Sequence, residues 1–236
     1  MTPTWKTAAS TLVADLQTVF GDRLRSVVAY GPRLEGDEDA PLSCLALVAS
    51  LEAGDLEKCA QLAHRWGRAD LAIPLVVPEG EFRRSLDAFP LEYGEIIRAH
   101  ERVQGDDPFV GVAIATADLR RACELQARSH LLHLRESFIE TGGRPAAVGR
   151  LVAASAPGFT ALLRNVARLS GVNTSDRVEA TRSGGRAAGM TDAMVTDMLN
   201  LEREPGVPAA DPSRLFPEYL AAVEQLSQVV DRWHDS

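Results

Sequence analysis

The sequence predicts an α+β protein, with a mixed β-sheet and flanking helices in its first half and an α-helical bundle in its second half. Short apolar and β-branched runs at 24–30 and 43–48 are bounded by Gly, Pro and charged residues, which is typical of neighbouring buried strands. From residue 116 onward the apolar residues recur at helical spacing without a strand signal. We therefore expect two domains, residues 1–112 and 113–236.

Composition limits the class of protein. The chain has 236 residues, of which 45% are hydrophobic and 25% charged, as in soluble globular proteins. No apolar run approaches the ~20 residues that span a bilayer, and Met1–Lys6 lacks the basic and apolar regions of a signal peptide. A net charge of −8 argues against binding to DNA, which requires Lys and Arg to displace counterions. We expect a cytoplasmic protein that does not bind membranes.

The three cysteines are consistent with the reducing environment of the cytoplasm. Cys44, Cys59 and Cys123 are scattered without metal-ligand spacing, and each lies in an apolar periodic setting. We interpret them as reduced core residues.

The first half begins with an amphipathic helix at 4–20 that Gly21 ends. After the two strands, Asp55 is placed to cap a helix that stops near Gly67. A third strand is predicted at 71–77, at a sheet edge or kinked, because Pro74 has no amide hydrogen to donate to the ladder.

The first domain ends with less regular patterns. A short helix is expected to start at Pro78, and a further strand or strand pair is predicted at 95–104. The turn residues of 105–109 predict a loop between the domains.

The second half is read as consecutive helices. A long helix is predicted at 116–140, stopped by Gly142 and Gly143. A second helical piece at 145–154 is expected to break at Pro157, which opens another helix that runs to Gly171.

The C-terminal part of the chain is predicted to contain a polar segment followed by two helices with N-cap residues. The segment 173–190 is polar and contains glycines, so we expect a mobile surface segment with one short helix. Thr191 and Asp211 are placed to start the last two helices.

The turn between the first two strands carries the most informative motif. Gly31-Pro32-Arg33 follows the first strand, and an acidic loop leads to Leu42-Ser43-Cys44 at the second. This arrangement resembles the nucleotidyltransferase superfamily (polymerase beta-like), and the helical bundle behind it is similar to the layout of aminoglycoside nucleotidyltransferases. The segment 74–109 also resembles bacterial proteins classed as nucleotidyltransferases. The resemblance implies a fold built for metal-dependent transfer of a nucleoside monophosphate.

The positions that carry this chemistry in the family are changed here. Members have Gly-Ser after the first strand and Asp-x-Asp at the second, whereas this chain has Pro32 at the Ser position. Counting along the loop places the two Asp positions at Leu42 and Cys44, neither of which offers the hard oxygen ligands of Mg²⁺. We therefore expect a nucleotidyltransferase-like protein without catalysis, metal or cofactor, which binds a small-molecule ligand or a protein partner in the inherited cleft.

Contacts to a nucleotide would be reduced as well. The candidates at the turn are Gly31, Arg33 and Ser43, because Pro32 has no amide hydrogen for a phosphate. Arg33 has the guanidinium geometry for a bidentate phosphate contact.

An active enzyme is the first alternative. Asp37 and Asp39 in the acidic loop, with Glu92 or Glu95 as a third carboxylate, would then hold Mg²⁺ with a nucleoside triphosphate and transfer the nucleotide to a small molecule or protein. However, the loop carboxylates precede Ala40 instead of opening a strand, so no rigid element fixes their separation. A solvated acidic loop is the competing interpretation.

A ribonuclease is the second alternative. Arg128 and His133 have the Arg-x4-His spacing that resembles the active motif of HEPN ribonucleases, in which His is the general base and Arg steadies the phosphate. Five residues along a helix separate the two side chains by about 140°, so they share a site only if a partner helix completes it.

Other polar residues of the second half have weaker implications. The resemblance to aminoglycoside-type enzymes implies that a helical carboxylate, Glu124 or Glu136, could act as a base; otherwise both are solvated. The arginines of the polar segment have no phosphate-loop spacing. A homodimer through the bundle is also considered, since helical periodicity does not separate core from interface.

Overall fold

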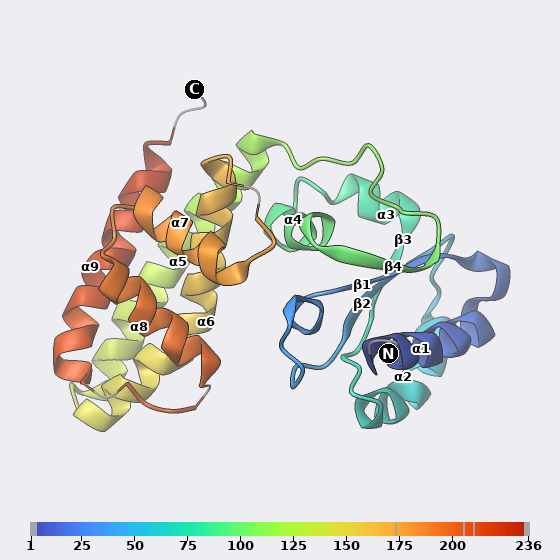
Figure 1. Ribbon diagram of the computed structural model, residues 1–236, viewed down its shortest axis with the longest axis horizontal. Coiled ribbons are helices and arrows are strands. Elements are labelled where there is room, and N and C mark those ends of the chain that lie inside the picture. The colour runs from blue at the N-terminus through green and yellow to red at the C-terminus, as the bar shows by residue number, and fades with distance from the viewer. Residues whose placement is uncertain (1–3, 173, 205, 210, 234–236) are drawn as a thin grey trace. The chain divides into compact units, whose positions relative to one another are not determined.

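The computed structural model of the chain describes residues 4–172, 174–204, 206–209 and 211–233 (Figure 1). The chain divides into two compact units, Met1–Ile114 and Ala115–Ser236. The first three residues, which belong to the segment examined for a signal peptide, lie outside the described residues.

A four-stranded mixed sheet forms the centre of unit 1, with the strand order β3-β2-β1-β4. The central strand β1 pairs antiparallel with both β2 and β4, and β2 pairs parallel with β3. The strands are β1 Leu24–Tyr30, β2 Ser43–Val48, β3 Leu75–Pro78 and β4 His100–Gly105. The predicted mixed sheet with its first two strands is confirmed.

Helices cover both faces of this sheet (Figure 1). One core cluster joins Leu12, Leu16 and Trp66 to Val27 of β1, and the other joins Phe82 and Ile96 to the opposite face. The helices of the first face are α1 Thr4–Phe20 and α2 Ala53–Arg68, and those of the second face are α3 Glu79–Arg84 and α4 Pro90–Arg98. Two short 3₁₀ turns, Gly21–Arg23 and Pro32–Glu35, flank β1.

Strand alternation divides the side chains of β2 between the two clusters. Cys44 and Ala46 pack in the cluster with α1 and α2, whereas Leu45 and Leu47 pack in the cluster with α3 and α4. β2 is therefore buried on both faces.

Three predictions for unit 1 need correction. The strand predicted at 71–77 is shorter: β3 begins at Leu75, and Leu71 makes an isolated bridge to Leu42. Pro74 cannot donate to a ladder, and the neighbouring Ile73 is 65% exposed.

The strand or strand pair predicted at 95–104 is also wrong in its first part. Helix α4 continues to Arg98, because Tyr93 and Ile96 are spaced to bury one helical face in the second cluster. Helix α2 starts earlier than predicted: Glu52 is its N-cap, and Asp55 is the third helical residue of a capping box.

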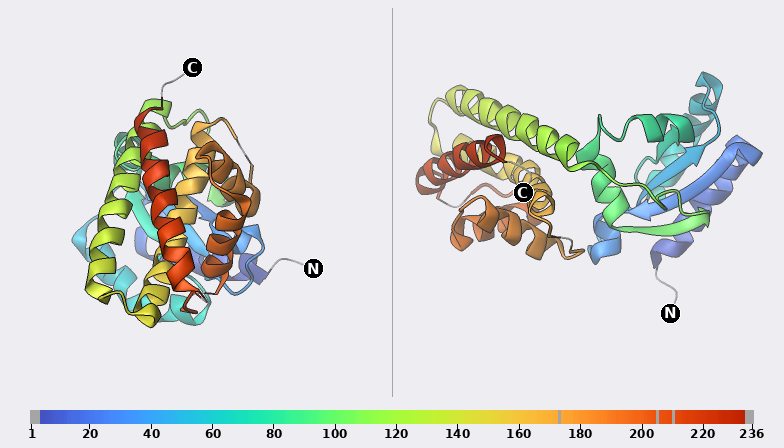
Figure 2. Two further views of the ribbon diagram at one scale, coloured as in Figure 1. Left: turned by 90° about the vertical axis from the view of Figure 1, so that its left-hand side faces the viewer. Right: turned by 90° about the horizontal axis from the view of Figure 1, so that it is seen from above.

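Unit 2 contains five α-helices within the described residues (Figures 1 and 2). The central helix is α6, which packs against the other four. The helices are α5 Thr116–Thr141, α6 Pro145–Leu169, α7 Arg177–Ala187, α8 Asp192–Arg203 and α9 Pro212–Asp231. The predicted bundle is confirmed, as are Thr191 and Asp211, whose side chains accept amide hydrogen bonds at the starts of α8 and α9.

The break predicted at Pro157 does not occur. Helix α6 runs through Pro157 without interruption, since Val152, Ala156 and Phe159 continue one buried face across the proline. Tertiary burial of this face outweighs the missing amide of Pro157. By length and hydropathy α6 is the one described helix that could span a membrane, but half of its most apolar window is buried in unit 2.

The described part of the segment predicted to be mobile, 174–190, forms mostly a helix that packs in unit 2. Asn173 lies outside the described residues, but Arg177–Ala187 form α7, which packs against α6. A Cβ on Gly184 would lie 1.8 Å from the backbone oxygen of Leu163. The glycines of this segment therefore allow two helices to approach closely.

Candidate functional site

The turn after β1 brings Gly31 next to Ser43. Gly31 has a φ of 88°, which favours glycine, and a Cβ at this position would lie 3.6 Å from the Ser43 hydroxyl oxygen. The turn closes on itself, since Leu34 N donates to Gly31 O at 3.0 Å and Asp37 N donates to Pro32 O at 3.1 Å. These two amides are already used and do not form a phosphate cradle.

Arg33 is occupied in the same loop. Its guanidinium donates to the carbonyl oxygen of Ala40 at 3.0 Å and ties the two ends of the acidic loop together. A phosphate contact by Arg33 would have to compete with this hydrogen bond. Of the three predicted nucleotide contacts, the structure brings Gly31 and Ser43 together and directs Arg33 into the loop.

The predicted metal positions lie in the core. Leu42 and Cys44 are 0% and 1% exposed and pack beneath α1 and α2, and burial raises the pKa of the Cys44 thiol to about 12. Carboxylates there would be sealed from any nucleotide. Because side chains alternate along a strand, a site on the other face would use Ser43 and Leu45. The counted positions Leu42 and Cys44 therefore lie on the face of β2 that α1 and α2 cover, and Ser43 lies on the other face.

No carboxylate lies on either face of this strand. β2 reads Ser43-Cys44-Leu45-Ala46-Leu47-Val48 and contains no acidic residue. The segment around Leu71 pairs with the residue before β2, since the amide of Ala72 donates a hydrogen bond to the carbonyl oxygen of Leu42 at 3.0 Å. By alternation from the buried Leu71, Ala72 lies on the same face as Ser43, and it also lacks a metal ligand.

The carboxylates of the active-enzyme alternative, Asp37, Asp39 and Glu92, are not grouped into a metal site by the structure. Asp37 accepts the amides of Asp39 and Ala40, each at 3.2 Å, and so stabilises the turn. Asp39 and Glu92 are exposed. Among the described residues, no group of three or more His, Cys, Asp or Glu side chains could hold a metal ion.

Two further carboxylates near the turn are held by an arginine. Arg98 of α4 contacts Glu35 and Glu95, each at 3.1 Å. Arg98 and Glu35 are only 13% and 11% exposed, so this ion cluster is partly desolvated. Glu95, a candidate third carboxylate, is thereby paired within α4, while Glu35 links α4 to the turn.

A different polar cluster lies inside unit 2. Arg164 of α6 and Arg177 of α7 both contact the same carboxylate oxygen of Glu202 on α8, at 3.3 and 3.1 Å. The Arg164 side chain is 7% exposed and that of Arg177 is 29% exposed. One turn along α6, Arg168 donates to Asn165 at 2.7 Å.

Sequence reasoning missed this cluster. Arg164 lies within the apolar periodicity of α6, and Arg177 was placed in a polar surface segment. An arginine that interrupts a strongly apolar helical face was the available signal, but its partner Glu202 lies 38 residues away. Three separate helices converge here, and their arrangement is not visible in local patterns.

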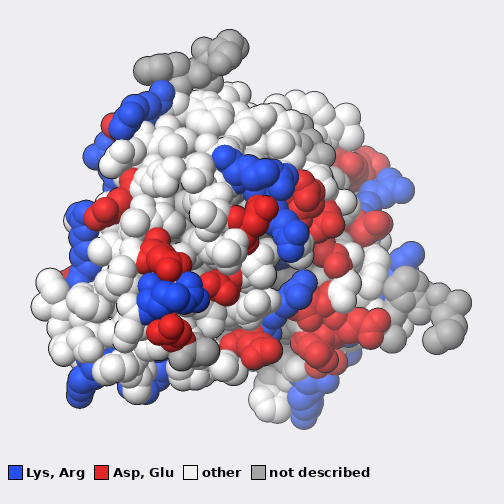
Figure 3. All heavy atoms as spheres, turned by 60° about the vertical axis from the view of Figure 1, so that its left-hand side comes forward, with Lys and Arg blue, Asp and Glu red and all other residues white. Residues whose placement is uncertain are grey.

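The ribonuclease residues are not brought into one site. Arg128 contacts Glu124 at 3.1 Å and Asp231 at 2.6 Å, while His133 is 75% exposed beside Glu136 at 3.5 Å. Both helical carboxylates considered as bases, Glu124 and Glu136, are thus in exposed or half-exposed ion pairs. The face drawn in Figure 3 has acidic and basic side chains interspersed, without a broad basic surface for RNA.

The more buried histidine of α5 is His130, which the motif did not include. Its Nε2 lies 2.6 Å from the Tyr219 hydroxyl, and its ring stacks on Phe159 with centroids 5.8 Å apart. Burial lowers the pKa of His130 to about 4 and raises the pKa of Tyr219. This pair joins α5, α6 and α9 as a neutral hydrogen-bonded contact.

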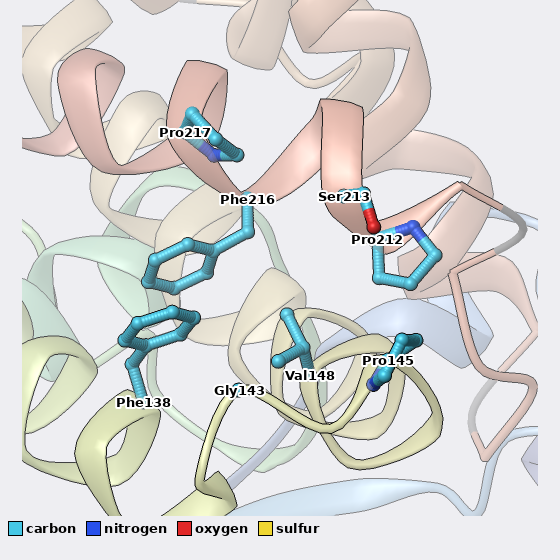
Figure 4. A pocket seen from close by; sticks show the side chains of 8 residues that line it. All are labelled: Phe138, Gly143, Pro145, Val148, Pro212, Ser213, Phe216 and Pro217. Atoms are coloured by element: carbon cyan, nitrogen blue, oxygen red, sulfur yellow. The ribbon is translucent and has the colours of Figure 1, made fainter.

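A shallow apolar pocket of about 170 Å³ lies between the end of α5 and the start of α9 (Figure 4). Phe138 and Phe216 stack with centroids 4.1 Å apart and form one wall. The other lining side chains are Pro145, Val148, Pro212, Ser213 and Pro217, with Gly143 at the rim. The pocket offers a single hydroxyl and no charge, so it lacks the groups that catalysis requires.

Comparison with known proteins identifies the fold. No family model matches the sequence, and no curated protein matches it. Among solved structures, the chain is similar to spectinomycin adenyltransferase AAD(9) from Enterococcus faecialis, determined with ATP and spectinomycin. The TM-score is 0.60 at 10% identity, over 96% of this chain and 99% of that chain. This chain has a nucleotidyltransferase-like fold.

The likeness covers both units, so the predicted α+β fold class is confirmed. At 10% identity it shows the fold alone. What a chain with this fold does depends on the side chains of its own site.

Proposed function

We propose that this chain is a non-catalytic nucleotidyltransferase-like protein that binds a nucleoside triphosphate through guanidinium groups instead of metal ions. The observation that carries the proposal is the meeting of Arg164 and Arg177 on one oxygen of Glu202, with Arg164 almost fully buried. We further propose that it is a soluble protein that binds its ligand in the cytoplasm.

Nucleotidyl transfer needs metal ions that bridge the triphosphate and activate the attacking hydroxyl. The strand that would supply their ligands contains no carboxylate, and Asp37 is used by its own turn. Glu35 and Glu95 contact Arg98, whose positive charge disfavours a nearby cation. These features support the loss of catalysis.

Arginine is well suited to bind phosphate without a metal. Its planar guanidinium makes two parallel hydrogen bonds to an oxyanion, and partial burial strengthens them. A triphosphate would bind by displacing Glu202 from Arg164 and Arg177, because like charges repel at this distance. The similar solved structure contains ATP, which makes ATP the first ligand to test.

Isothermal titration calorimetry with ATP tests this proposal. We expect binding that is equal with Mg²⁺ and with EDTA, without nucleotidyl transfer to any acceptor. Arg177→Gln is expected to weaken binding about tenfold or more, since a charge-assisted contact is lost. Arg186→Gln on the same helix, where Arg186 pairs with Glu179 at 2.7 Å, is the matched control and should bind normally.

Other outcomes select other functions. Binding that requires Mg²⁺ and is lost in Asp39→Ala supports the active enzyme and overturns the proposal. RNA cleavage that is lost in His133→Ala supports the ribonuclease. Absence of ATP binding under both conditions refutes the arginine site while leaving the loss of catalysis in place.

A further inference from the structure

A line of exposed apolar side chains runs along α5. Leu125, Leu132 and Ile139 are 71%, 64% and 77% exposed. Because they are seven residues apart, they deviate from one line by only about 20° per step. Helix α5 lies at the edge of the helical unit in both views of Figure 2. We call these three side chains the α5 stripe.

The stripe points away from the core of unit 2. The buried side chains of α5, which include Cys123, Ala127 and Leu134, lie on the opposite side of the helix, about 160–220° around its axis. The stripe therefore does not help to pack the bundle. A single exposed leucine is ordinary, but three at heptad spacing supply one of the two apolar positions per heptad with which helices pair.

The two sides of the stripe differ in charge. By helical geometry the basic side chains Arg128 and Arg135 follow one side, where Glu124 is also placed and contacts Arg128. The acidic side chains Glu136 and Glu140 follow the other side; all of these lie about 40–80° from the stripe. Arg121 and Asp118 extend the same division at the start of the helix. Flanking charges of this kind set the partner and orientation of paired helices.

We propose that the α5 stripe is a homodimer interface in which two copies of α5 pack in parallel about a two-fold axis along the helix. In that arrangement the basic flank of each copy faces the acidic flank of the other. An antiparallel two-fold pair would instead set Arg128 and Arg135 against the same residues of the second copy. The charge pattern therefore selects a second copy as the partner and the parallel orientation.

The ion pairs that Arg128 and Arg135 make within the chain leave room for contacts with the acidic flank of a second copy. Arg128 contacts Asp231 and Arg135 contacts Glu224, at 2.6 and 2.7 Å, on half-exposed surfaces. A guanidinium has five donors, so each arginine can also reach a carboxylate of the second copy.

The dimensions also suit a dimer. With 26 residues, α5 is ~39 Å long, which is close to four heptads. The stripe supplies an apolar centre and the charged flanks supply a polar rim, which is the usual anatomy of a stable interface of ~800 Å² per partner.

Sedimentation velocity tests the interface on the full chain. We expect a dimer for the wild type, and at least about a 100-fold larger dissociation constant for Leu132→Glu, because two buried carboxylates would meet at the axis. Leu56→Glu, at a 52% exposed position of α2, is the matched control and should stay dimeric. A circular dichroism melt of each variant verifies that the chain is folded. A monomeric wild type at ~100 µM, or a dimer insensitive to Leu132→Glu, refutes the interface.

Disulfide trapping tests the orientation. In the parallel pair, Leu125→Cys and Ile139→Cys each form a disulfide with the same variant, because equal positions face each other. In an antiparallel pair, neither variant links to itself, and only a mixture of the two forms a disulfide. The three native cysteines are free and buried, so they give little background. Linkage only in the mixture contradicts the proposed dimer.

Discussion

Units 1 and 2 bury their polar groups in different ways. In unit 1 the strand β2 is apolar on both faces, and the nearby charges tie loops together, as Arg33 does to Ala40 and Arg98 to Glu35. In unit 2, Arg164 and His130 lie between helices and join separate elements. Unit 1 also buries charged groups, since Asp15 of α1 accepts a hydrogen bond from Trp66 of α2 and Asp55 pairs with Arg23. Its strand β2, however, carries no charged residue, whereas in unit 2 the buried Arg164 lies on the central helix α6.

The largest expected effect concerns the close contact of α6 and α7. Gly184→Ala places a Cβ 1.8 Å from the Leu163 oxygen, so unit 2 should lose roughly 3 kcal/mol of unfolding free energy. Gly158→Ala is the matched control, since the nearest atom to its new Cβ is 3.9 Å away. This control should stabilise α6 by about 0.5–1 kcal/mol. Urea unfolding of both variants checks the prediction, and equal effects would contradict the packing described.

The next effect is a pH dependence of unit 2. The pKa of His130 falls from 6.5 to about 4 in the folded state. Between these two pH values His130 is protonated in the unfolded chain and neutral in the folded chain. Stability is complete above pH 6.5 and decreases as the pH falls to about 4, by up to about 3 kcal/mol in total. Urea unfolding between pH 7 and 4 measures this slope. His130→Gln should remove most of the slope, and an unchanged slope would show that another group titrates.

Unit 1 should resist acid to a lower pH. The Arg23 hydrogen bond and charge hold the pKa of Asp55 at about 2, so its contribution is complete above the ordinary value of 3.8 and is lost as the pH falls to about 2. Hydrogen exchange at pH 4.5 should therefore show amides of unit 2 opening before those of unit 1. The reverse order would break the comparison between the units. Arg23→Gln should move the acid transition of unit 1 to higher pH.

The smallest effects are expected at the acidic loop and α4. Asp39 and Glu92 are exposed, so Asp39→Ala and Glu92→Ala should each change stability by less than about 0.5 kcal/mol. Under the proposed function, ATP binding should also be unchanged, because neither carboxylate would hold a metal. Calorimetry and thermal melts check both points, and a tenfold loss of binding in either variant would restore the active-enzyme hypothesis.

Local patterns were sufficient for much of the fold. The strands β1 and β2 follow from apolar runs between turn residues, and α1 and α5 follow from long periodic stripes that Gly21 and Gly142 end. The predicted sheet-then-bundle order rests on these segments. They are also the ones in which propensity, periodicity and caps agree.

The remaining errors have tertiary causes. Counting along the loop does not show which face of β2 Cys44 occupies, because neighbouring side chains of a strand alternate; packing against α1 and α2 shows it. Pro157 was predicted to break a helix and the glycines near Gly184 to lie in a mobile segment, yet burial against neighbouring helices keeps both residues within helices. The Arg164–Glu202 pair joins distant segments, so no local spacing could reveal it.

The central claim is that unit 1 has no protein ligands for catalytic metals. Crystals grown with Mn²⁺ and a non-hydrolysable ATP analogue, measured at the manganese absorption edge, test it most directly. The account predicts no anomalous peak coordinated by carboxylates near Gly31 and Ser43. Two manganese ions held there by Asp37, Asp39 or Glu92 would contradict it.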